Sequence, residues 1–370
     1  MTNSHDEDWQ VLLRLFPSNW EELAHSSGAV KRLRGFDSVG DLLRTLLLHI
    51  GPGYSLRETV VRAKAAGLAS VSDVALLKRL RSAGEWWRLL AVELLREQAG
   101  AVAEADPIRV IDGSVISEPG PTGSQWRFHY SLRLPSLHCD HFEVTAATGA
   151  GNGERLDRFD FQAGEIVLAD RAYLHPRALA WAMARRIGLV VRYNSGSTPL
   201  YDRRGRRWPL LSRVRKLRPG QAREWSVHVH VRSGEELLPG RLCALAKSAA
   251  ATEQARHKIL RRARRNQVQV REETFELAAY VLVWTNLDPT YSSERVLAFY
   301  RQRWQIEMAF KRLKSLAELG HLPKHDPESS RAWLYGKLML ALLGEKLDRI
   351  GRDISPWGYP LQQAGGEPVA

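Results

Sequence analysis

The pattern of hydrophobic and polar residues divides the chain into a helical first part and a strand-rich second part. Up to about residue 100, apolar residues recur every three to four positions, which is the spacing of amphipathic helices. The longest such pattern runs from Val74 to about Gln98, with Ser72 as a candidate N-cap. From Pro107 onward, β-branched and aromatic residues alternate with polar ones, as they do in half-buried strands. We therefore predict a helical N-terminal domain over residues 1–100 and a mixed α/β region after it.

Five strands and one helix are predicted between residues 101 and 193. Three alternating segments come first, at 108–116, 126–134 and 141–146. An apolar segment at 165–170 follows and ends on an aspartate, and a helix at about 176–187 precedes the last strand at 189–193. Four strands, a helix and a strand is the order of a ribonuclease-H-like core, in which the first and fourth strands are neighbours. We predict an α/β (α+β) fold with this core.

The segment 194–275 differs from its surroundings. It is rich in Arg and in turn-forming Pro and Gly, and it contains an alternating strand at 225–231 and an Arg-dense helix at 255–267. We predict that it is a basic, mostly β insertion in the catalytic core, which then comprises 101–193 and 276–347. Pro and Gly dominate the end of the chain, so that residues 348–370 are predicted to be a flexible tail.

The net charge of +13 is concentrated in one part of the chain. Residues 201–271 hold 19 Lys and Arg against 5 Asp and Glu, whereas the remaining residues hold 35 against 36. A local excess of this kind suits contact with the phosphate backbone of a nucleic acid. The alternative is a solvent-exposed loop region with a basic bias.

Several classes of protein are excluded by the composition. No apolar run approaches the roughly 20 residues of a membrane span, and the acidic N-terminus is unlike a secretory signal. The two cysteines, Cys139 and Cys243, lie too far apart in sequence to indicate a disulfide framework. There is no phosphate loop, dinucleotide-binding glycine pattern or Gly-x-Ser-x-Gly motif. We predict a cytoplasmic protein without a membrane partner or a small-molecule substrate.

One predicted helix gathers charged and aromatic residues on one face. Its pattern runs from about Ser293 to Leu319 without Gly or Pro. At about 100° per residue, Tyr300, Arg303, Glu307 and Lys314 fall within roughly 60° of one another around the helix. Lys311 joins this face, and Trp304 lies beside it. The simpler interpretation is an amphipathic helix with Arg–Glu pairing at i,i+4.

These residues resemble the signature of a known enzyme family. Tyr, two residues, Arg, three residues, Glu, six residues, Lys is the signature of bacterial insertion-sequence transposases of the DDE type, specifically the IS-four group. Tyr300, Arg303, Glu307 and Lys314 match it at every spacing. The sequences Val-Ile-Asp-Gly-Ser and Val-Leu-Ala-Asp-Arg-Ala-Tyr also resemble the family's, although many relatives have Gly where this chain has Ala172. The resemblance covers roughly residues 30–345.

The resemblance implies a DNA transposase that cuts at transposon ends and joins them to target DNA. Asp112, Asp170 and Glu307 would be the catalytic carboxylates and the ligands of Mg²⁺ or Mn²⁺. Two such ions, about 3.5–4 Å apart, activate the nucleophile and support the leaving oxygen. The implied phosphate contacts are Tyr300, Arg303, Lys311 and Lys314, and Trp304 would stack on a flipped base.

The implied partners are the terminal inverted repeats of the transposon, the target DNA and a second copy of the chain on paired ends. The implied location is the bacterial cytoplasm, near the nucleoid. Three alternatives stay open on the sequence. Instead of an active transposase, the chain could be an inactive or domesticated DNA-binding protein or a structure-selective nuclease. The N-terminal helices form either a helix–turn–helix or an ordinary bundle. Trp208 and Trp225 are either a second stacking platform or core residues.

Overall fold

The computed structural model describes residues 4–99, 107–116, 126–134, 139–231, 236–304, 308, 322 and 326–353. Its helices are α1 (Ser4–Leu13), α2 (Trp20–Ser26), α3 (Val39–Ile50), α4 (Leu56–Ala65), α5 (Asp73–Ser82), α6 (Gly84–Ala99), α7 (Pro176–Ala184), α8 (Leu210–Val214), α9 (Ala249–Asn266), α10 (Glu272–Leu277), α11 (Ser293–Gln302) and α13 (Pro327–Asp353). Its strands are β1 (Ile108–Ile116), β2 (Trp126–Leu134), β3 (Cys139–Ala146), β4 (Ile166–Ala169), β5 (Gly188–Arg192), β6 (Ala222–His230), β7 (Leu237–Ala246) and β8 (Tyr280–Thr285). Two short 3₁₀ turns, η1 (Leu156–Arg158) and η2 (Arg171–Tyr173), flank β4. Across these ranges, we find no helix that combines the length and apolar character needed to cross a bilayer.

Residues 4–99 fold into helices joined by short connections, as predicted. Serines cap three of the helices, because Ser38, Ser55 and Ser72 each accept a hydrogen bond from the backbone N–H three residues further on. The predicted start at Ser72 is therefore confirmed. The long helix predicted from Val74 to Gln98 is instead two helices, α5 and α6, separated by a turn at Ala83. This turn places Trp86, Trp87 and Leu90 of α6 in the core.

The strands form one eight-stranded sheet in the order β3-β2-β1-β4-β5-β8-β7-β6. β1, β2 and β3 are an antiparallel meander, and β4 and β5 run parallel to β1 and to each other. This is the predicted ribonuclease-H-like order, with the first and fourth strands as neighbours. The fold class predicted from the sequence is therefore confirmed.

Four strands end at the same edge of the sheet. β8 is antiparallel to both β5 and β7, and so β7 runs in the same direction as β1, β4 and β5. We call the edge at which β4, β5 and β7 end, at Ala169, Arg192 and Ala246, the carboxyl edge. In open α/β sheets, the ends of such strands are where functional side chains collect.

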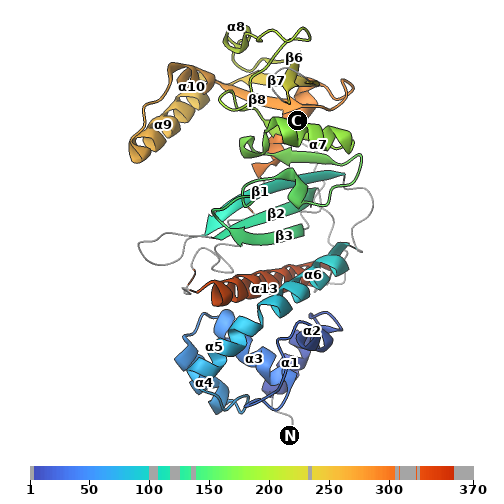
Figure 1. The fold of residues 1–370 in the computed structure, drawn as a ribbon, viewed down its shortest axis with the longest axis vertical. Coiled ribbons are helices and arrows are strands. Elements are labelled where there is room, and N and C mark those ends of the chain that lie inside the picture. The colour runs from blue at the N-terminus through green and yellow to red at the C-terminus, as the bar shows by residue number, and fades with distance from the viewer. Residues whose placement is uncertain are drawn as a thin grey trace.

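Both faces of the sheet are covered, which explains why its central strands are almost continuously apolar. On one face, Val110, Leu168 and Val190 belong to a core shared with the N-terminal helices and α13. On the other face, Val167 and Leu189 pack into a second core that includes residues of α7. Figure 1 shows the N-terminal helices, the α6–α13 layer and the sheet stacked along the long axis of the molecule.

The segment 194–275 contributes both to the sheet and to its surroundings. β6 and β7 extend the sheet through β8, and the segment also carries α8, α9 and most of α10. Helix α9 projects away from the sheet next to α10 (Figure 1). At the other end of the chain, α13 continues to Asp353, so the tail predicted from residue 348 begins within a helix. Residues 354–370 lie outside the described ranges.

Candidate active site at the carboxyl edge

The pairing of β1 with β4 places two predicted catalytic residues beside each other. Each paired residue of β1 is opposite the residue of β4 that lies 58 positions later, as in Ile108 with Ile166 and Val110 with Leu168. The same register, continued by two residues, sets Asp112 opposite Asp170. An even step along each strand also keeps both side chains on the face of Val110 and Leu168. Neighbouring strands lie about 4.8 Å apart, a separation that a pair of metal ions can bridge.

Asp112 lies inside β1 rather than at its end. Its side chain is 24% exposed, and its Oδ1 accepts a hydrogen bond of 2.8 Å from the Gly113 amide. A methyl group on Gly113 would lie 3.1 Å from Oε1 of Glu154, which ion-pairs with Arg127. Glycine here therefore allows the connection between β3 and β4 to pass close behind the aspartate. The Asp-Gly pair is part of a strand, not the turn that the dipeptide alone favours.

Asp170 follows β4 directly and is the N-cap residue of η2. Its side chain is half-buried, and no side chain in the described ranges hydrogen-bonds or ion-pairs with its carboxylate. Three residues later the chain turns inward at Tyr173, which is 1% exposed. Burial, and then the charge of Asp112, raise the pKa of the Tyr173 phenol well above its usual value. The Tyr173 phenol therefore stays neutral and adds no charge near the two aspartates.

Helix α11 and its C-cap bring Tyr300 and Arg303, two residues of the signature described above, to the same edge. Nη1 of Arg303 lies 3.7 Å from Oδ2 of Asp112, and its guanidinium lies over the Tyr300 ring at 5.9 Å. Burial raises the pKa of Tyr300; Arg303 and Arg192 oppose this shift, and Asp170 adds to it. Tyr300 therefore lies close enough to Asp170, Arg192 and Arg303 for their charges to shift its pKa.

The predicted helix from Ser293 to Leu319 is described over its first part only. Helix α11 starts at Ser293, as predicted, and ends at Gln302, with Arg303 as its C-cap. Trp304 is 49% exposed, which suits a ring that stacks on a base. Glu307, Lys311 and Lys314 lie outside the described residues, so their predicted roles remain predictions.

Arg192 is a candidate site residue that the sequence analysis missed. β4 pairs with β5 so that Ala169 is opposite Val191, and the next step sets Asp170 beside Arg192. Arg192 is exposed at the end of an otherwise buried strand. In the sequence, Arg192 is a single cation after the apolar run Leu189-Val-Val. Its position beside Asp170 becomes visible only when β5 is known to pair with β4.

The two tryptophans considered as a second stacking platform pack against each other. Trp208 is 8% exposed, and its ring meets that of Trp225 edge-on at a centroid distance of 5.5 Å. Trp208 belongs to the second core, and Trp225 packs partly buried against it. The alternative that these residues are core is therefore correct for Trp208, which has no free face for a base.

The chain is similar in sequence to known transposases. The family model described as Transposase DDE domain matches residues 144–343. The chain is 33% identical over 376 residues to InsL of insertion sequence element IS186A from Escherichia coli strain K12, and 34% identical over 378 residues to the transposase for insertion sequence element IS421 from Escherichia coli. Each alignment covers 99% of both chains.

A solved structure is also similar at the level of the fold. It is the cryo-EM structure of a piggyBac transposase synaptic complex with hairpin DNA, with a TM-score of 0.47 and 9% sequence identity. The alignment covers 93% of this chain and 76% of that chain.

The family model describes a class of enzymes that carry out phosphoryl transfer on DNA. The family match and the full-length relatives are more specific: the chain belongs to the DDE transposases of bacterial insertion sequences. Its activity is DNA transposition, a sequence of phosphodiester hydrolysis and transesterification.

Proposed function

We propose that this transposase cuts DNA at the ends of its own insertion element and joins the freed 3′ ends to target DNA, with Asp112, Asp170 and Glu307 as the catalytic carboxylates. The observation that carries the proposal is the β1–β4 register, which sets Asp112 beside Asp170. The two acids come from segments 58 residues apart in the sequence and meet at one edge of the sheet.

The two aspartates fit a divalent metal. Carboxylate oxygens are the ligands that Mg²⁺ and Mn²⁺ prefer, and the carboxylate of Asp170 has no competing partner in the described ranges. We propose that Asp112, Asp170 and Glu307 hold two such ions. When bound, these ions lower the pKa of the attacking water or 3′-hydroxyl and neutralise charge at phosphorus.

Arg303 has a second role in this proposal. At 3.7 Å, its contact with Asp112 is a loose ion pair between partly exposed groups, and such pairs contribute little. The guanidinium can therefore leave Asp112 for a phosphate oxygen, with which it forms bidentate hydrogen bonds. Tyr300, Lys311 and Lys314 hold neighbouring phosphates, and Trp304 stacks on a base that has left the duplex.

The remaining partners follow from the reaction. DNA is the substrate at three places, namely the two terminal inverted repeats and the target, and two ends require two active sites. We propose that the chain acts as a homodimer on paired ends in the bacterial cytoplasm, near the nucleoid. Residues 1–100 are proposed to grip end DNA; Arg57, Arg62 and Lys64 are exposed there.

The variant Asp170→Asn tests the proposal because it removes a charged ligand without changing the shape of the side chain. Gel shift should show unchanged binding to terminal-repeat DNA. Mg²⁺-dependent nicking of the same DNA should fall by more than the roughly 10- to 100-fold that loss of an outer-shell partner costs at a metal site.

Asp160→Asn is the matched control, because Asp160 is an exposed acid in the segment between β3 and β4. This variant should cut DNA at the wild-type rate. Normal nicking by Asp170→Asn would overturn the assignment of the site. Binding without nicking by the wild type would indicate a DNA-binding protein without catalysis, and nicking without joining to target DNA would indicate a nuclease.

A further inference from the structure

Helix α9 presents a face of cations to solvent. It has 18 residues and buries none of them. Five of its basic side chains are exposed, and at about 100° per residue they fall within roughly 160° of the helix surface. They are Lys258, Arg261, Arg262, Arg264 and Arg265.

The opposite face of α9 is the one that packs. Ala255, Ile259 and Ala263 are half-buried there, and the guanidinium of Arg256 lies 4.8 Å from the centre of the Phe275 ring. The helix is fixed at its start by Ser248, whose side chain accepts a hydrogen bond from a backbone amide. The orientation of the cationic face is therefore set by packing, with no role for the cations themselves.

These cations have no acidic partners in the part of the chain that the structure describes. The single acid on α9 is Glu253, and it lies 3.1 Å from His257. Five like charges on one side of a helix repel one another, and pairs at i,i+4 such as Arg261 and Arg265 each destabilise it by a few tenths of a kcal/mol. A helix with this composition suits an anionic partner that lies along it.

The base of α9 is connected to the candidate active site by further cations. Lys247 follows the end of β7, at the carboxyl edge, and α9 starts two residues later. Burial lowers the pKa of the Lys247 amine, and the charges of Arg192 and Lys258 lower it further, so each of these two cations is close to Lys247. The order along the edge is therefore Asp170, Arg192, Lys247 and then the cationic face of α9.

We propose that the carboxyl edge and α9 form one continuous track for a DNA backbone, which leads from the cleaved phosphate over Arg192 and Lys247 to the five exposed cations of α9. The inference rests on the proposed function, because it names how the DNA substrate extends beyond the catalytic carboxylates. The track contacts phosphates, which carry no sequence information directly.

The dimensions of the track suit duplex DNA. From β4 to β7 there are three strand spacings, about 14 Å, which is the axial length of about four nucleotides of one strand. Helix α9 adds about 27 Å at 1.5 Å per residue.

A membrane surface fits less well than DNA. Interfacial helices pair their basic side with a broad exposed apolar side. On α9, by contrast, Ala255, Ile259 and Ala263 are half-buried, and the adjacent Arg256 lies over the ring of Phe275.

The double variant Arg261→Gln/Arg265→Gln tests the track in the full-length protein. Glutamine keeps the helix propensity and removes two neighbouring charges. Fluorescence anisotropy should show weaker binding to terminal-repeat DNA and to an unrelated duplex of the same length alike. The slope of log K against log salt concentration should decrease by about two, one for each lost phosphate contact.

A matched control lies in the same segment but at the opposite edge of the sheet. Arg203 and Arg204 are exposed, and the neighbouring Gly205 lies near His230 and Leu237, where β6 ends and β7 begins. Arg203→Gln/Arg204→Gln makes the same charge change and should leave the salt slope unchanged. An equal decrease in both double variants would reflect net charge alone and overturn the track, and so would an unchanged slope in the α9 variant.

The two proposals fail in different experiments. If the wild type binds DNA with the predicted dependence on α9 but cuts nothing, the catalytic proposal is wrong and the track stands. If the wild type cuts its ends while the α9 variant binds as the wild type does, the track is wrong and the catalytic proposal stands.

Discussion

In the proposed site, Arg303 is the residue that would link the binding of DNA to the charge of the proposed catalytic carboxylates. It lies 3.7 Å from Asp112 and over the ring of Tyr300, so it occupies the space between the acid and the helix. A guanidinium that pairs with a metal ligand competes with the metal for that ligand. Arg303 is therefore expected to weaken metal binding through its contact with Asp112 and to speed the chemical step through its contact with phosphate.

Replacement of Arg303 by Gln should separate these effects. The nicking rate at saturating Mg²⁺ should fall roughly 10- to 100-fold, because a charge-assisted hydrogen bond to phosphate is lost. The Mg²⁺ concentration that gives half the maximal rate should fall as well, because the guanidinium no longer competes with Mg²⁺ for the Asp112 carboxylate. Both quantities come from one Mg²⁺ titration of the nicking rate.

Arg301→Gln is the control, since Arg301 is exposed on the same helix and has the same charge. It should change neither quantity. A higher Mg²⁺ requirement in Arg303→Gln would show that Arg303 supports the metal site instead of competing with it.

His129 links the stability of the sheet to pH. It is fully buried on β2, and its Nε2 lies 3.0 Å from the hydroxyl of Thr145. Burial lowers its pKa to about 3, and the charges of Arg158, Arg127 and His141 contribute in the same direction. The unfolded chain binds a proton at about pH 6.5, which the folded chain does not accept until about pH 3. Stability is therefore complete above pH 6.5 and decreases as the pH falls toward 3.

The pH dependence of unfolding should show this group. Each pH unit in that window costs up to about 1.4 kcal/mol of the free energy of unfolding. Between pH 6.5 and 5, the wild type should lose about 2 kcal/mol more than His129→Gln, measured by chemical denaturation. His257→Gln, at an exposed site, should follow the wild type. Parallel curves for all three proteins would show that folding does not lower the pKa of His129.

Much of the site was predictable at the scale of single residues, but not all of it. Asp112, Asp170 and Arg303 are predicted from the sequence through the family resemblance, which depends on the residue spacing along one helix and on acids placed in or after apolar strands. Arg192 was missed because its meaning depends on which strand lies next to β4. Strand neighbours are decided by packing across the whole sheet, which no local pattern encodes.

Among the elements, helix α9 shows where prediction from periodicity reaches its limit. The Arg-dense run predicts a helix at 255–267, but the helix starts at Ala249, after Ser248 as N-cap. A run of three alanines has high helix propensity and no periodicity, so only the cap marks this start. The split between α5 and α6 has the opposite origin, because a continuous helical pattern was broken by packing against α13.

The junction between β7 and β8 depends on one glycine. A methyl group on Gly240 would lie 2.4 Å from the ring of Trp284, which is fully buried. Indole rings are rigid and the core around this one is closed, so the neighbour cannot move aside cheaply. This close approach holds the added strands of the segment 194–275 against the ribonuclease-H-like core.

Gly240→Ala should therefore destabilise the protein by about 1–3 kcal/mol, the usual cost of overpacking. Gly344→Ala is the control, because no neighbouring atom of the described residues, apart from the backbone of α13 itself, lies within 4 Å of the added methyl group. It should stabilise the protein by about 0.5–1 kcal/mol through helix propensity. Thermal unfolding of both variants measures the difference, and a neutral Gly240→Ala would show that the strand junction is loose.

At the scale of the whole molecule, one core joins parts of the chain that the sequence presents as separate. Leu46 of α3, Leu90 of α6, Val110 of β1 and Leu338 of α13 belong to the same buried cluster. The N-terminal helices and the catalytic sheet are therefore attached through α6 and α13. Any DNA gripped by residues 1–100 is in this way held at a fixed position relative to the carboxyl edge.

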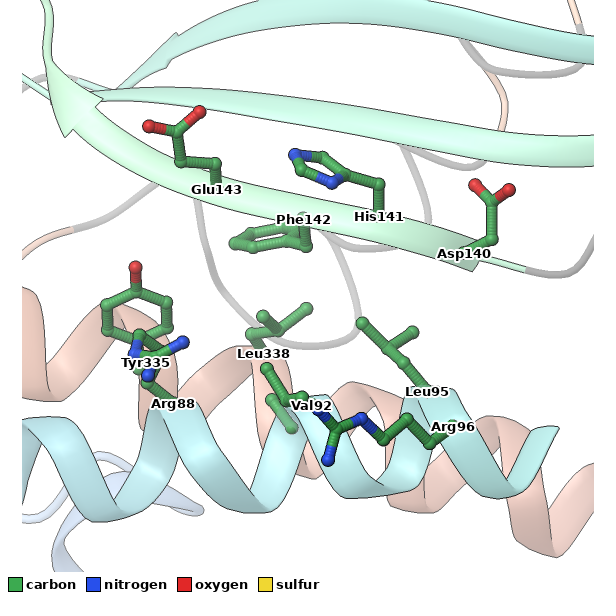
Figure 2. Close-up of a pocket in the computed structure, with 11 residues that line it drawn as sticks. Arg88, Val92, Leu95, Arg96, Asp140, His141, Phe142, Glu143, Tyr335 and Leu338 are labelled. Carbon is green, nitrogen blue, oxygen red and sulfur yellow. The ribbon is translucent and has the colours of Figure 1, made fainter. Parts of the chain in front are cut away.

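A pocket of about 440 Å³ lies within this attachment, between α6, α13 and β3. Figure 2 shows Phe142 pointing into it from β3, above Val92, Leu95 and Leu338. The same strand carries Asp140, which ion-pairs with Arg109 and Arg133 on the neighbouring strands.

The central claim is that distant segments of this chain meet around shared divalent ions, and iron-directed cleavage of the polypeptide tests it most directly. Fe²⁺ in place of Mg²⁺, with ascorbate and peroxide, generates hydroxyl radicals that cut the backbone next to the bound ion. In the complex with terminal-repeat DNA, we expect cuts close to Asp112 and close to Asp170, both suppressed by excess Mg²⁺ and both absent in Asp170→Asn. Cuts near only one of the two aspartates, or only in segments away from the carboxyl edge, would contradict the site.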